Sequence, residues 1–454
     1  MAKIPTIPKG MRDFSPIQMR KREYLIDIIK DCFENYGFEP IATPSMENLE
    51  SLTGKYGDDG EQLIFKILNS GDFLSKLNID EHSTSSSVVS TLSNKALRYD
   101  LTVPFARYVV QNRNEISFPF KRYQIQNVWR ADRPQKGRFR EFTQCDADII
   151  GTDSLIPESE LIQIFDDVFS MVGLKNYRIR INNRKILSGL AEVLNAEDHF
   201  VDITVGLDKL DKIGIDKVKQ ELLAKGLSSK VVEKLSVIFD LKGPHRQQIS
   251  QLRAFLSTSA TGLQGLDELE YLLDVIDEFP LNSAKLDIDF CLARGLNYYT
   301  GAIFEVVSDE VAIGSICGGG RYDDLTGLFG LEGVSGVGVS FGLDRIFHVM
   351  EELSLFPAAL HESTKVMFVN FGKSESLYCL KLLRKLRQLG VKSELYPSDV
   401  KIKKQMQYAH RKNVQYVIII GDDEIKDNTM IVKNMFESSQ KNMTFEELID
   451  ILKN

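Results

Sequence analysis

The sequence predicts an α+β domain that is interrupted by a mostly helical insertion and followed by a small α/β domain. Apolar, strand-like runs cluster on both sides of a central region, at 120–130, 146–151, 302–307 and 337–343. The central region itself, residues 185–286, contains amphipathic helical patterns separated by Gly and Ser. The last ninety residues alternate strand and helix patterns in β–α–β order, which is typical of a small, mostly parallel sheet.

The length agrees with this organisation, because 454 residues are too many for one hydrophobic core and suit two or three domains. We expect the first domain to comprise residues 1–184 and 287–352, on either side of the insertion at 185–286. The C-terminal domain is expected at 365–454, after a linker near 351–364.

The first domain begins with a predicted helix at 17–36, whose apolar residues recur at helical spacing before Gly37. A strand with two prolines follows at 38–48, and prolines favour an edge strand or an interface. Residues 69–96 are rich in Ser and Asn and are expected to form a loop or hairpin. A further helix is predicted at 159–173, between the strand runs of the two halves.

The C-terminal domain shows the same kind of local pattern in each of its elements. Strands are predicted at 365–371, 392–397 and 415–424, and helices at 375–390 and 401–413. This order predicts a small sheet with helices packed against it.

The net charge of −8 conceals two basic islands. Residues 121–140 hold seven Lys or Arg and one Asp, and residues 365–412 hold twelve Lys or Arg and three acidic residues. Two basic islands on an acidic body fit a partner whose phosphates are contacted at two separate places, as in a nucleic acid. Solvated helix faces are the alternative explanation for a basic run on its own.

Composition and spacing exclude several functional classes. No window approaches the roughly 20 apolar residues that a membrane span needs, and the N-terminus lacks the apolar core of a secretory signal. The five cysteines are scattered, which indicates reduced thiols in a cytoplasmic protein and disfavours a thiolate zinc site. The stretch "GVGVSFG" (336–342) has GxGxxxG spacing, which differs from the dinucleotide fingerprint.

Arginines at the ends of strand-like runs are the strongest chemical signal. Arg130 closes an apolar run and is followed by a polar loop and a return strand, so a hairpin presenting guanidinium groups is expected. Arg294 precedes two tyrosines, Arg321 follows three glycines, and Arg345 falls at the start of a predicted helix. The planar guanidinium binds phosphate oxygens through paired charge-assisted hydrogen bonds, so this set favours a polyphosphate ligand. A surface ion pair is the common alternative for any single one of them.

These segments resemble a known enzyme family. The hairpin resembles motif 2 of class II aminoacyl-tRNA synthetases, "GVSFGLDRIF" (338–347) resembles motif 3, and "FEPIATPSMEN" (38–48) is similar to motif 1, the dimer-interface element. The peptides "LARGLNYYTGAIFEV" (292–306) and "CGGGRYDDL" (317–325) resemble the two signature peptides of histidyl-tRNA synthetases. The chain is therefore identified as a member of that family, and the resemblance runs from about residue 5 to the C-terminus. It implies a class II synthetase-like antiparallel sheet flanked by helices and a C-terminal anticodon-binding α/β domain.

The resemblance implies ATP-dependent ligation of L-histidine to tRNA(His) through a histidyl-adenylate, with release of AMP and pyrophosphate. Arg130 and Arg294 are the expected catalytic residues at the α-phosphate of ATP. Arg138 and Arg345 are expected to hold the outer phosphates, and Phe142 is expected to stack under adenine. Mg²⁺ is also expected, although the sequence assigns no ligands to it.

The resemblance also implies a histidine site built from polar side chains, because imidazole is small and must be read by hydrogen bonds. When the wrong amino acid binds such a site, polar groups are buried without hydrogen-bond partners. This mismatch discriminates against the wrong amino acid by on the order of 10⁴-fold. The expected residues are Asp100, Thr102 and Gln144 at the α-amino group, Asp148, Tyr299 and Tyr322 at the imidazole ring, and Arg294 and Tyr298 beside the amino acid.

The remaining partners also follow from the resemblance. Arg133 and Gln135 match positions of the motif 2 loop that contact the acceptor end of the tRNA. We further expect phosphate contacts from the C-terminal domain, a homodimer formed through motif 1, a cytoplasmic location and no membrane association.

Two alternatives remain at this point. A non-catalytic paralogue that acts as a regulatory subunit of histidine biosynthesis typically lacks the C-terminal domain and has eroded signature peptides. A generic RNA-binding protein has no need of Arg130, Arg294 and Arg345 together with a polar amino-acid pocket. Asp132 and Asp100 depart from the family pattern, since many members carry Glu there, and the role of the Ser-rich stretch 69–96 stays open.

Overall fold

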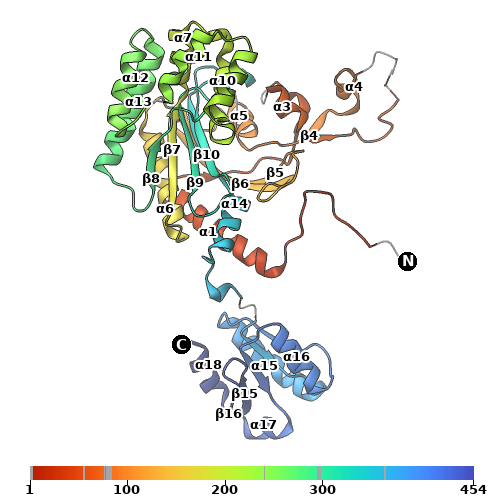
Figure 1. The fold of residues 1–454 in the computed structure, drawn as a ribbon. Coiled ribbons are helices and arrows are strands. Elements are labelled where there is room, and N and C mark those ends of the chain that lie inside the picture. Colours follow the sequence, from red (N-terminus) through yellow and green to blue (C-terminus); the bar gives the residue numbers. More distant parts are fainter. Residues whose placement is uncertain are drawn as a thin grey trace. The chain divides into compact units, whose positions relative to one another are not determined.

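The computed structural model describes residues 4–54, 57–75, 77, 84–239, 241–293, 298–361 and 364–453. The chain divides into two compact units, Met1–Leu355 and Phe356–Asn454, and each unit has a sheet of its own (Figure 1).

The larger unit is built on an eight-stranded sheet in the order β1-β5-β6-β11-β10-β9-β7-β8. Neighbouring strands are antiparallel except in the two outermost pairs, β1–β5 and β7–β8, which are parallel. This arrangement confirms the predicted antiparallel sheet with flanking helices. The strands are β1 (Glu39–Pro40), β5 (Phe120–Trp129), β6 (Glu141–Ile150), β7 (Tyr177–Asn183), β8 (Lys285–Ile288), β9 (Ala302–Ser308), β10 (Ser315–Tyr322) and β11 (Gly336–Gly342).

Three helices pack against one face of this sheet, α1 (Pro16–Asn35), α6 (Ile156–Met171) and α14 (Leu343–Glu352). The rings of Phe33 on α1 and of Phe165 and Phe169 on α6 lie 5.7, 5.2 and 5.9 Å from the ring of Phe341 on β11. All four side chains are fully buried, and each contributes roughly 1.5–3 kcal/mol by leaving water. Because side chains alternate along a strand, Phe341 on the helix face places Ser340 on the opposite face.

The predicted helix at 17–36 is confirmed as α1. It begins where the Ser15 hydroxyl accepts a hydrogen bond from the backbone N–H of Gln18, and the Gln18 side chain in turn accepts from the backbone N–H of Ser15. This reciprocal capping, with Pro16 in the first turn, satisfies donors that a helix start leaves unpaired.

The predicted strand at 38–48 is split in two. Glu39–Pro40 forms β1 at the edge of the large sheet, whereas β2 (Met46–Asn48) joins a small sheet with β4 (Lys95–Leu97) and β3 (Lys66–Ile67). Within 69–96, residues 85–92 form a helix, α4 (Ser85–Leu92), and residues 76 and 78–83 lie outside the described part of the chain. Short helices α2 (Leu49–Leu52) and α3 (Gly57–Gln62) and the longer α5 (Thr102–Gln111) complete this region.

The helical insertion is confirmed, and its helices gather at one side of the larger unit, in green in Figure 1. Helices α7 and α13 approach so closely that a Cβ added to Gly189 would lie 2.5 Å from the Cα of Gly262. The helices are α7 (Arg184–Leu194), α8 (Phe200–Asp208), α9 (Leu210–Ile213), α10 (Ile215–Ala224), α11 (Ser229–Leu235), α12 (His245–Phe255) and α13 (Ala260–Glu278).

The C-terminal unit has a five-stranded sheet in the order β13-β12-β14-β15-β16. The three predicted strands are parallel, but β15 and β16 extend the sheet in antiparallel fashion, so the sheet is mixed rather than mostly parallel. Apolar side chains cover both of its faces. Its elements are β12 (Val366–Phe368), α15 (Lys373–Gln388), β13 (Ser393–Leu395), α16 (Ile402–Arg411), β14 (Tyr416–Ile419), α17 (Asp422–Asp427), β15 (Met430–Asn434), β16 (Ser439–Met443) and α18 (Phe445–Lys453).

None of the helices within the described residues combines the length and the apolar character needed to cross a membrane.

Candidate active site

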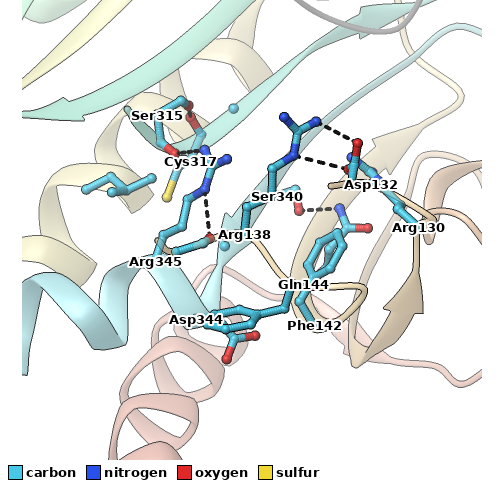
Figure 2. A pocket seen from close by; sticks show the side chains of 15 residues that line it. Arg130, Asp132, Arg138, Phe142, Gln144, Ser315, Cys317, Ser340, Asp344 and Arg345 are labelled. Carbon is cyan, nitrogen blue, oxygen red and sulfur yellow. Dashed lines mark hydrogen bonds and ion pairs between the residues drawn. The ribbon is translucent and has the colours of Figure 1, made fainter. Parts of the chain in front are cut away.

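Two joined cavities lie at the centre of the large sheet. The first, which we call the arginine cavity, has a volume of about 240 Å³ and is shown in Figure 2. The second, which we call the tyrosine cavity, has a volume of about 280 Å³. They share five lining residues and therefore adjoin one another. The shared residues are Arg130, Gln144, Ser315, Gly318 and Ser340.

The β5–β6 hairpin forms one wall of the arginine cavity. The strands pair in register from Phe120 opposite Ile150 to Trp129 opposite Glu141. Beyond Trp129, the backbone N–H of Arg130 donates to the carbonyl of Arg140 at 2.9 Å, and the loop then closes through reciprocal backbone hydrogen bonds between Gln135 and Arg138.

Three predicted phosphate-binding arginines line this cavity (Figure 2). The Arg130 guanidinium lies over the ring of Tyr99, with 4.2 Å to the centroid, and its Nε donates to the Tyr99 carbonyl at 3.0 Å. Arg138 makes a two-pronged contact with Asp132, at 3.1 and 3.0 Å. Arg345, near the start of α14, donates to the carbonyls of Gly137 and Ser315.

The remaining predicted residues of the phosphate site have three different outcomes. Phe142 also lines the arginine cavity, and its ring centroid lies 5.3 Å from the Arg130 guanidinium. Arg294 lies outside the residues that the structure describes. Arg321 lines neither cavity, because it is buried and bound by Glu158 at 2.5 and 2.7 Å. Arg321 therefore forms a buried ion pair, which differs both from a phosphate contact in these cavities and from the surface ion pair named as the alternative.

The tyrosine cavity contains the residues predicted for an α-amino group. Asp100, Thr102 and Gln144 all line it. Asp100 Oδ1 accepts a hydrogen bond from the backbone N–H of Val103 at 3.2 Å, which fixes its carboxylate at the start of α5.

Gln144 stands at the junction of the two cavities with one half of its amide engaged. Its Nε2 donates to Ser340 Oγ at 2.7 Å. Its Oε1 is buried and has no hydrogen-bond partner among the described residues. A buried acceptor without a partner costs about 1–3 kcal/mol, so this oxygen is suited to a ligand that donates a hydrogen bond.

Asp148 and Tyr322 lie behind the lining of the tyrosine cavity, and neither is among its lining residues. The Tyr322 hydroxyl donates to Asp148 Oδ1 at 2.6 Å, and the buried Arg122 forms an ion pair with Asp148 Oδ2 at 2.7 Å. Burial raises the pKa of Asp148, although Arg122 and the Tyr322 hydroxyl oppose the shift. The rings of Tyr298 and Tyr299 line the cavity itself, and their centroids are 5.0 Å apart.

Glycines on β10 and β11 make room for this cluster. A Cβ at Gly338 would lie 1.9 Å from Asp148 Oδ1, and a Cβ at Gly320 would lie 2.8 Å from the Tyr299 ring. The three glycines that precede Arg321, at 318–320, sit within β10. A Cβ at Gly319 would lie 2.2 Å from the carbonyl oxygen of Gly338 on the neighbouring strand. Neighbouring strands therefore require glycine at Gly319 and Gly320, the Tyr299 ring adds to the requirement at Gly320, and the Asp148 side chain requires glycine at Gly338.

Asp146 is a second buried carboxylate on the same strand face as Asp148. Burial raises the pKa of Asp146 to about 7, against the opposing effect of Arg122. Sequence reasoning identified neither Asp146 nor Arg122. Both lie within apolar strand patterns, and only the alternation of side chains along β5 and β6 offered a signal.

The described residues form no preformed site for Mg²⁺. Nowhere among them do three or more His, Cys, Asp or Glu side chains gather as a metal site would require. The two carboxylates of the arginine cavity, Asp132 and Asp344, are each engaged by arginine side chains. In nucleotide sites Mg²⁺ is usually held by one or two carboxylates, by water and by the phosphates of the substrate.

Known proteins match the whole chain. The family described as Histidyl-tRNA synthetase matches residues 10–346, and the one described as Anticodon binding domain matches residues 365–454. Relatives named Histidine--tRNA ligase include those of Christiangramia forsetii, 56% identical over 100% of both chains, and Flavobacterium johnsoniae, 52% identical over 99% of both chains.

Solved structures show the same likeness. The histidyl-tRNA synthetase from Nostoc sp. PCC 7120 is 30% identical, with a TM-score of 0.81, over 99% of this chain and 100% of that one. A protein described as an ATP phosphoribosyltransferase regulatory subunit/histidyl-tRNA synthetase from Bacillus halodurans C, 23% identical with a TM-score of 0.73, shares the fold alone.

Proposed function

The chain belongs to the histidyl-tRNA synthetase family, and we propose that its two joined cavities hold the small substrates of that reaction, ATP and histidine. The protein ligates L-histidine to tRNA through a histidyl-adenylate intermediate, with release of AMP and pyrophosphate. Identity of 52–56% to histidine–tRNA ligases over essentially the full length favours this enzyme over the regulatory paralogue.

ATP fits the arginine cavity because several fixed guanidinium groups face one small hollow there. We assign Arg130 to the α-phosphate, Arg138 and Arg345 to the outer phosphates, and Phe142 to the adenine ring. Arg138 is paired with Asp132 and its side chain is 44% exposed, so phosphate oxygens can compete for its donors. Arg294 is assigned to the α-phosphate by family resemblance. We expect Mg²⁺ to arrive with the phosphates rather than to be held by the free protein.

The chemistry of the first step demands positioning more than acid–base catalysis. An oxygen of the histidine carboxylate attacks the α-phosphorus, and the bond from that phosphorus to the pyrophosphate oxygen breaks. The carboxylate is already ionised at neutral pH and needs no protein base. Rate acceleration therefore comes from alignment of the two substrates and from cationic groups placed where negative charge accumulates on the phosphoryl oxygens.

Histidine fits the tyrosine cavity, and the observation that carries this assignment is Gln144 Oε1, which has no hydrogen-bond partner within the described part of the chain. The α-ammonium group has three donors, and it can bind Gln144 Oε1 together with the side chains of Asp100 and Thr102. Because Arg130 and Gln144 line both cavities, an amino acid bound in one would lie beside the α-phosphate bound in the other, which supports the paired assignment.

We assign recognition of the imidazole ring to Asp148, Tyr299 and Tyr322, with Tyr298 completing the wall. Asp148 lies one layer behind the cavity and is held from both sides by Arg122 and Tyr322. A fixed carboxylate discriminates in favour of a ring N–H, because other side chains leave that carboxylate buried and unmatched.

The second step, transfer to tRNA, involves surfaces outside the cavities. Arg133 and Gln135 are exposed at the tip of the β5–β6 loop, where they can meet the acceptor end. The exposed cations of α15 and α16 suit the phosphates of the anticodon arm. We further propose a homodimer formed through the motif 1 segment, whose strand β1 lies at the edge of the sheet, and a cytoplasmic location.

One pair of assays tests the assignment. The wild-type protein should exchange labelled pyrophosphate into ATP only when histidine is present, and should then transfer histidine to tRNA. Gln144→Leu, which keeps the bulk but removes Oε1, should lower kcat/KM for histidine by about 10- to 100-fold, because a hydrogen bond to a charged group is removed. If Gln144→Leu exchanges pyrophosphate with an unchanged KM for histidine, the assignment of histidine to the tyrosine cavity is wrong.

A further inference from the structure

The N-terminal segment that precedes α1 lies against the outside of the β5–β6 loop. The backbone N–H of Arg140 donates to the carbonyl of Gly10 at 2.8 Å, and Arg140 Nη1 donates to the carbonyl of Lys9 at 3.4 Å. Gly10 has a φ of +86°, and a Cβ there would lie 2.9 Å from side-chain atoms of Arg140 and Pro134. The segment is therefore in close contact with this loop over several residues.

Arg12 extends from this segment toward the wall of the arginine cavity. Its guanidinium lies 3.3 Å from the centroid of the Phe139 ring, and it forms an ion pair with Asp344. Phe139 belongs to the β5–β6 loop and Asp344 to the first turn of α14, and both line the arginine cavity. One side chain thus joins the two elements on either side of that cavity.

Neutralising Asp344 does not require Arg12. Arg22 on α1 already forms an ion pair with Asp344 Oδ1 at 2.5 Å and donates to Thr143 Oγ1 at 2.9 Å, and its side chain is only 7% exposed. The backbone N–H of Thr143 donates to the other oxygen, Asp344 Oδ2, at 3.1 Å. What Arg12 adds is the contact with Phe139, which Arg22 does not make.

We propose that Arg12 is a positioning residue of the nucleotide site. It holds the Phe139 end of the loop to Asp344 on α14 and thereby fixes the width of the arginine cavity. The inference rests on the proposed assignment of ATP to that cavity. Its consequence is selective, because a looser loop impairs ATP binding while the tyrosine cavity, which contains neither Phe139 nor Asp344, keeps its histidine site.

The single tryptophan of the chain offers a direct readout. Trp129 ends β5 immediately before Arg130, so its fluorescence can be followed during separate titrations of the full-length protein with ATP and with histidine. Arg12→Ala should weaken ATP binding about tenfold, the size expected for a partly desolvated cation–π contact together with an ion pair. Histidine binding should change less than twofold. Arg12→Lys keeps the charge but removes the planar stack on Phe139, and should weaken ATP binding to an intermediate degree.

Two further variants make the result decisive. Lys9→Ala removes an exposed cation from the same segment and should leave both affinities unchanged. Arg130→Ala tests the site assignment itself, since it should abolish detectable ATP binding.

If Arg130→Ala binds ATP normally, the assignment of ATP to the arginine cavity is wrong. If it loses ATP while Arg12→Ala binds both ligands like the wild type, or loses both equally, the role of Arg12 is wrong. Should Arg12→Ala fail to fold, the ratio of the two affinities in Arg12→Lys decides the same question.

Discussion

At the scale of single residues, the proposed recognition of histidine depends on a carboxylate that is held from two sides. Asp148 is 2% exposed and is bound by the Tyr322 hydroxyl and by Arg122. We predict that Asp148→Ala raises the KM for histidine by about 100-fold or more and changes the KM for ATP far less, because the arginine cavity keeps all of its lining residues. Pyrophosphate exchange as a function of each substrate measures both constants. An unaltered histidine requirement in this variant would refute the role of Asp148.

Asp146 lies on the same face of β6 as Asp148, and its protonation makes the stability of the folded protein depend on pH. Its pKa is raised to about 7 in the folded protein, whereas a free aspartate has a pKa near 3.9. Between about pH 4 and pH 7 the folded state therefore binds a proton that the unfolded state has released. Each pKa unit corresponds to about 1.4 kcal/mol, so stability falls by a few kcal/mol as the pH rises through this window. Above pH 7 no further destabilisation arises from this group.

Asp146→Asn should therefore be stabilised relative to the wild type by more at pH 8 than at pH 5, as measured by thermal unfolding. Asp153→Asn, which changes an exposed aspartate near the end of the same strand, serves as the matched control. Its difference from the wild type should be the same at both pH values. A pH-independent difference for Asp146→Asn as well would show that Asp146 is ionised throughout.

The sequence revealed the residues that carry charge into the site but not those that hold them in place. Arg130 and Arg345 could be found because an arginine at the end of an apolar run is a local pattern. Arg122 lies inside such a run, and its ion pair with Asp148 and its place over the Phe105 ring, 4.2 Å from the centroid, depend on elements distant in sequence. Arg12 escaped prediction for the same reason, since its contacts with Phe139 and Asp344 are tertiary.

At the scale of elements, the β5–β6 loop has an inner side that faces the arginine cavity and an exposed tip. Arg133 and Gln135 belong to the tip, whereas Gly137 and Arg138 line the cavity. We predict that Arg133→Ala lowers kcat/KM for tRNA about tenfold and leaves histidine-dependent pyrophosphate exchange within twofold of wild type, because the adenylate site is untouched.

Lys136→Ala is the appropriate control for this loop. Lys136 is also exposed at the tip, and its ion pair with Glu352 is solvent-accessible on both sides, so its removal costs little. Aminoacylation assays with all three proteins at one ionic strength would separate a specific contact from a general reduction of positive charge. Equal effects of the two substitutions on tRNA use would argue against specific reading by Arg133.

Long, strongly patterned elements were predicted well, whereas the glycine-rich β10 and the division of the strand at 38–48 were not. The helix at 17–36 and the strands at 120–130 and 302–307 correspond to α1, β5 and β9. By contrast, β10 was missed because three consecutive glycines favour a loop in isolation, and only the closeness of β9 and β11 makes them a strand. The pattern at 38–48 could not show that its two ends join different sheets, since that depends on partners elsewhere in the chain.

At the scale of the whole molecule, the site forms where two halves of the first unit meet. Strand β6 from the first half pairs with β11 from the second, from Gln144 opposite Gly342 to Ile150 opposite Gly336. The insertion leaves the sheet after β7 and returns at β8, two parallel neighbours at the far edge. An insertion at that edge can vary in size without displacing β6 and β11, which explains how a chain interrupted by so many residues still assembles one site.

The C-terminal unit is expected to supply much of the affinity for tRNA through its basic island. Removing one cation that binds a phosphate lowers the slope of log K against log salt by about 0.7–0.9, because fewer counterions are released on binding. Lys403 and Lys404 are exposed on α16. The double substitution Lys403→Ala/Lys404→Ala in the full-length protein should lower that slope by about 1–2 units while leaving pyrophosphate exchange unchanged.

The matched control is Lys426→Ala/Lys441→Ala. It removes the same charge from exposed positions outside residues 365–412 and should leave the slope nearly intact. Filter binding between about 50 and about 300 mM salt gives the slopes. Equal slopes for both double variants would mean that tRNA responds to the overall charge of the protein and not to the surface of α16.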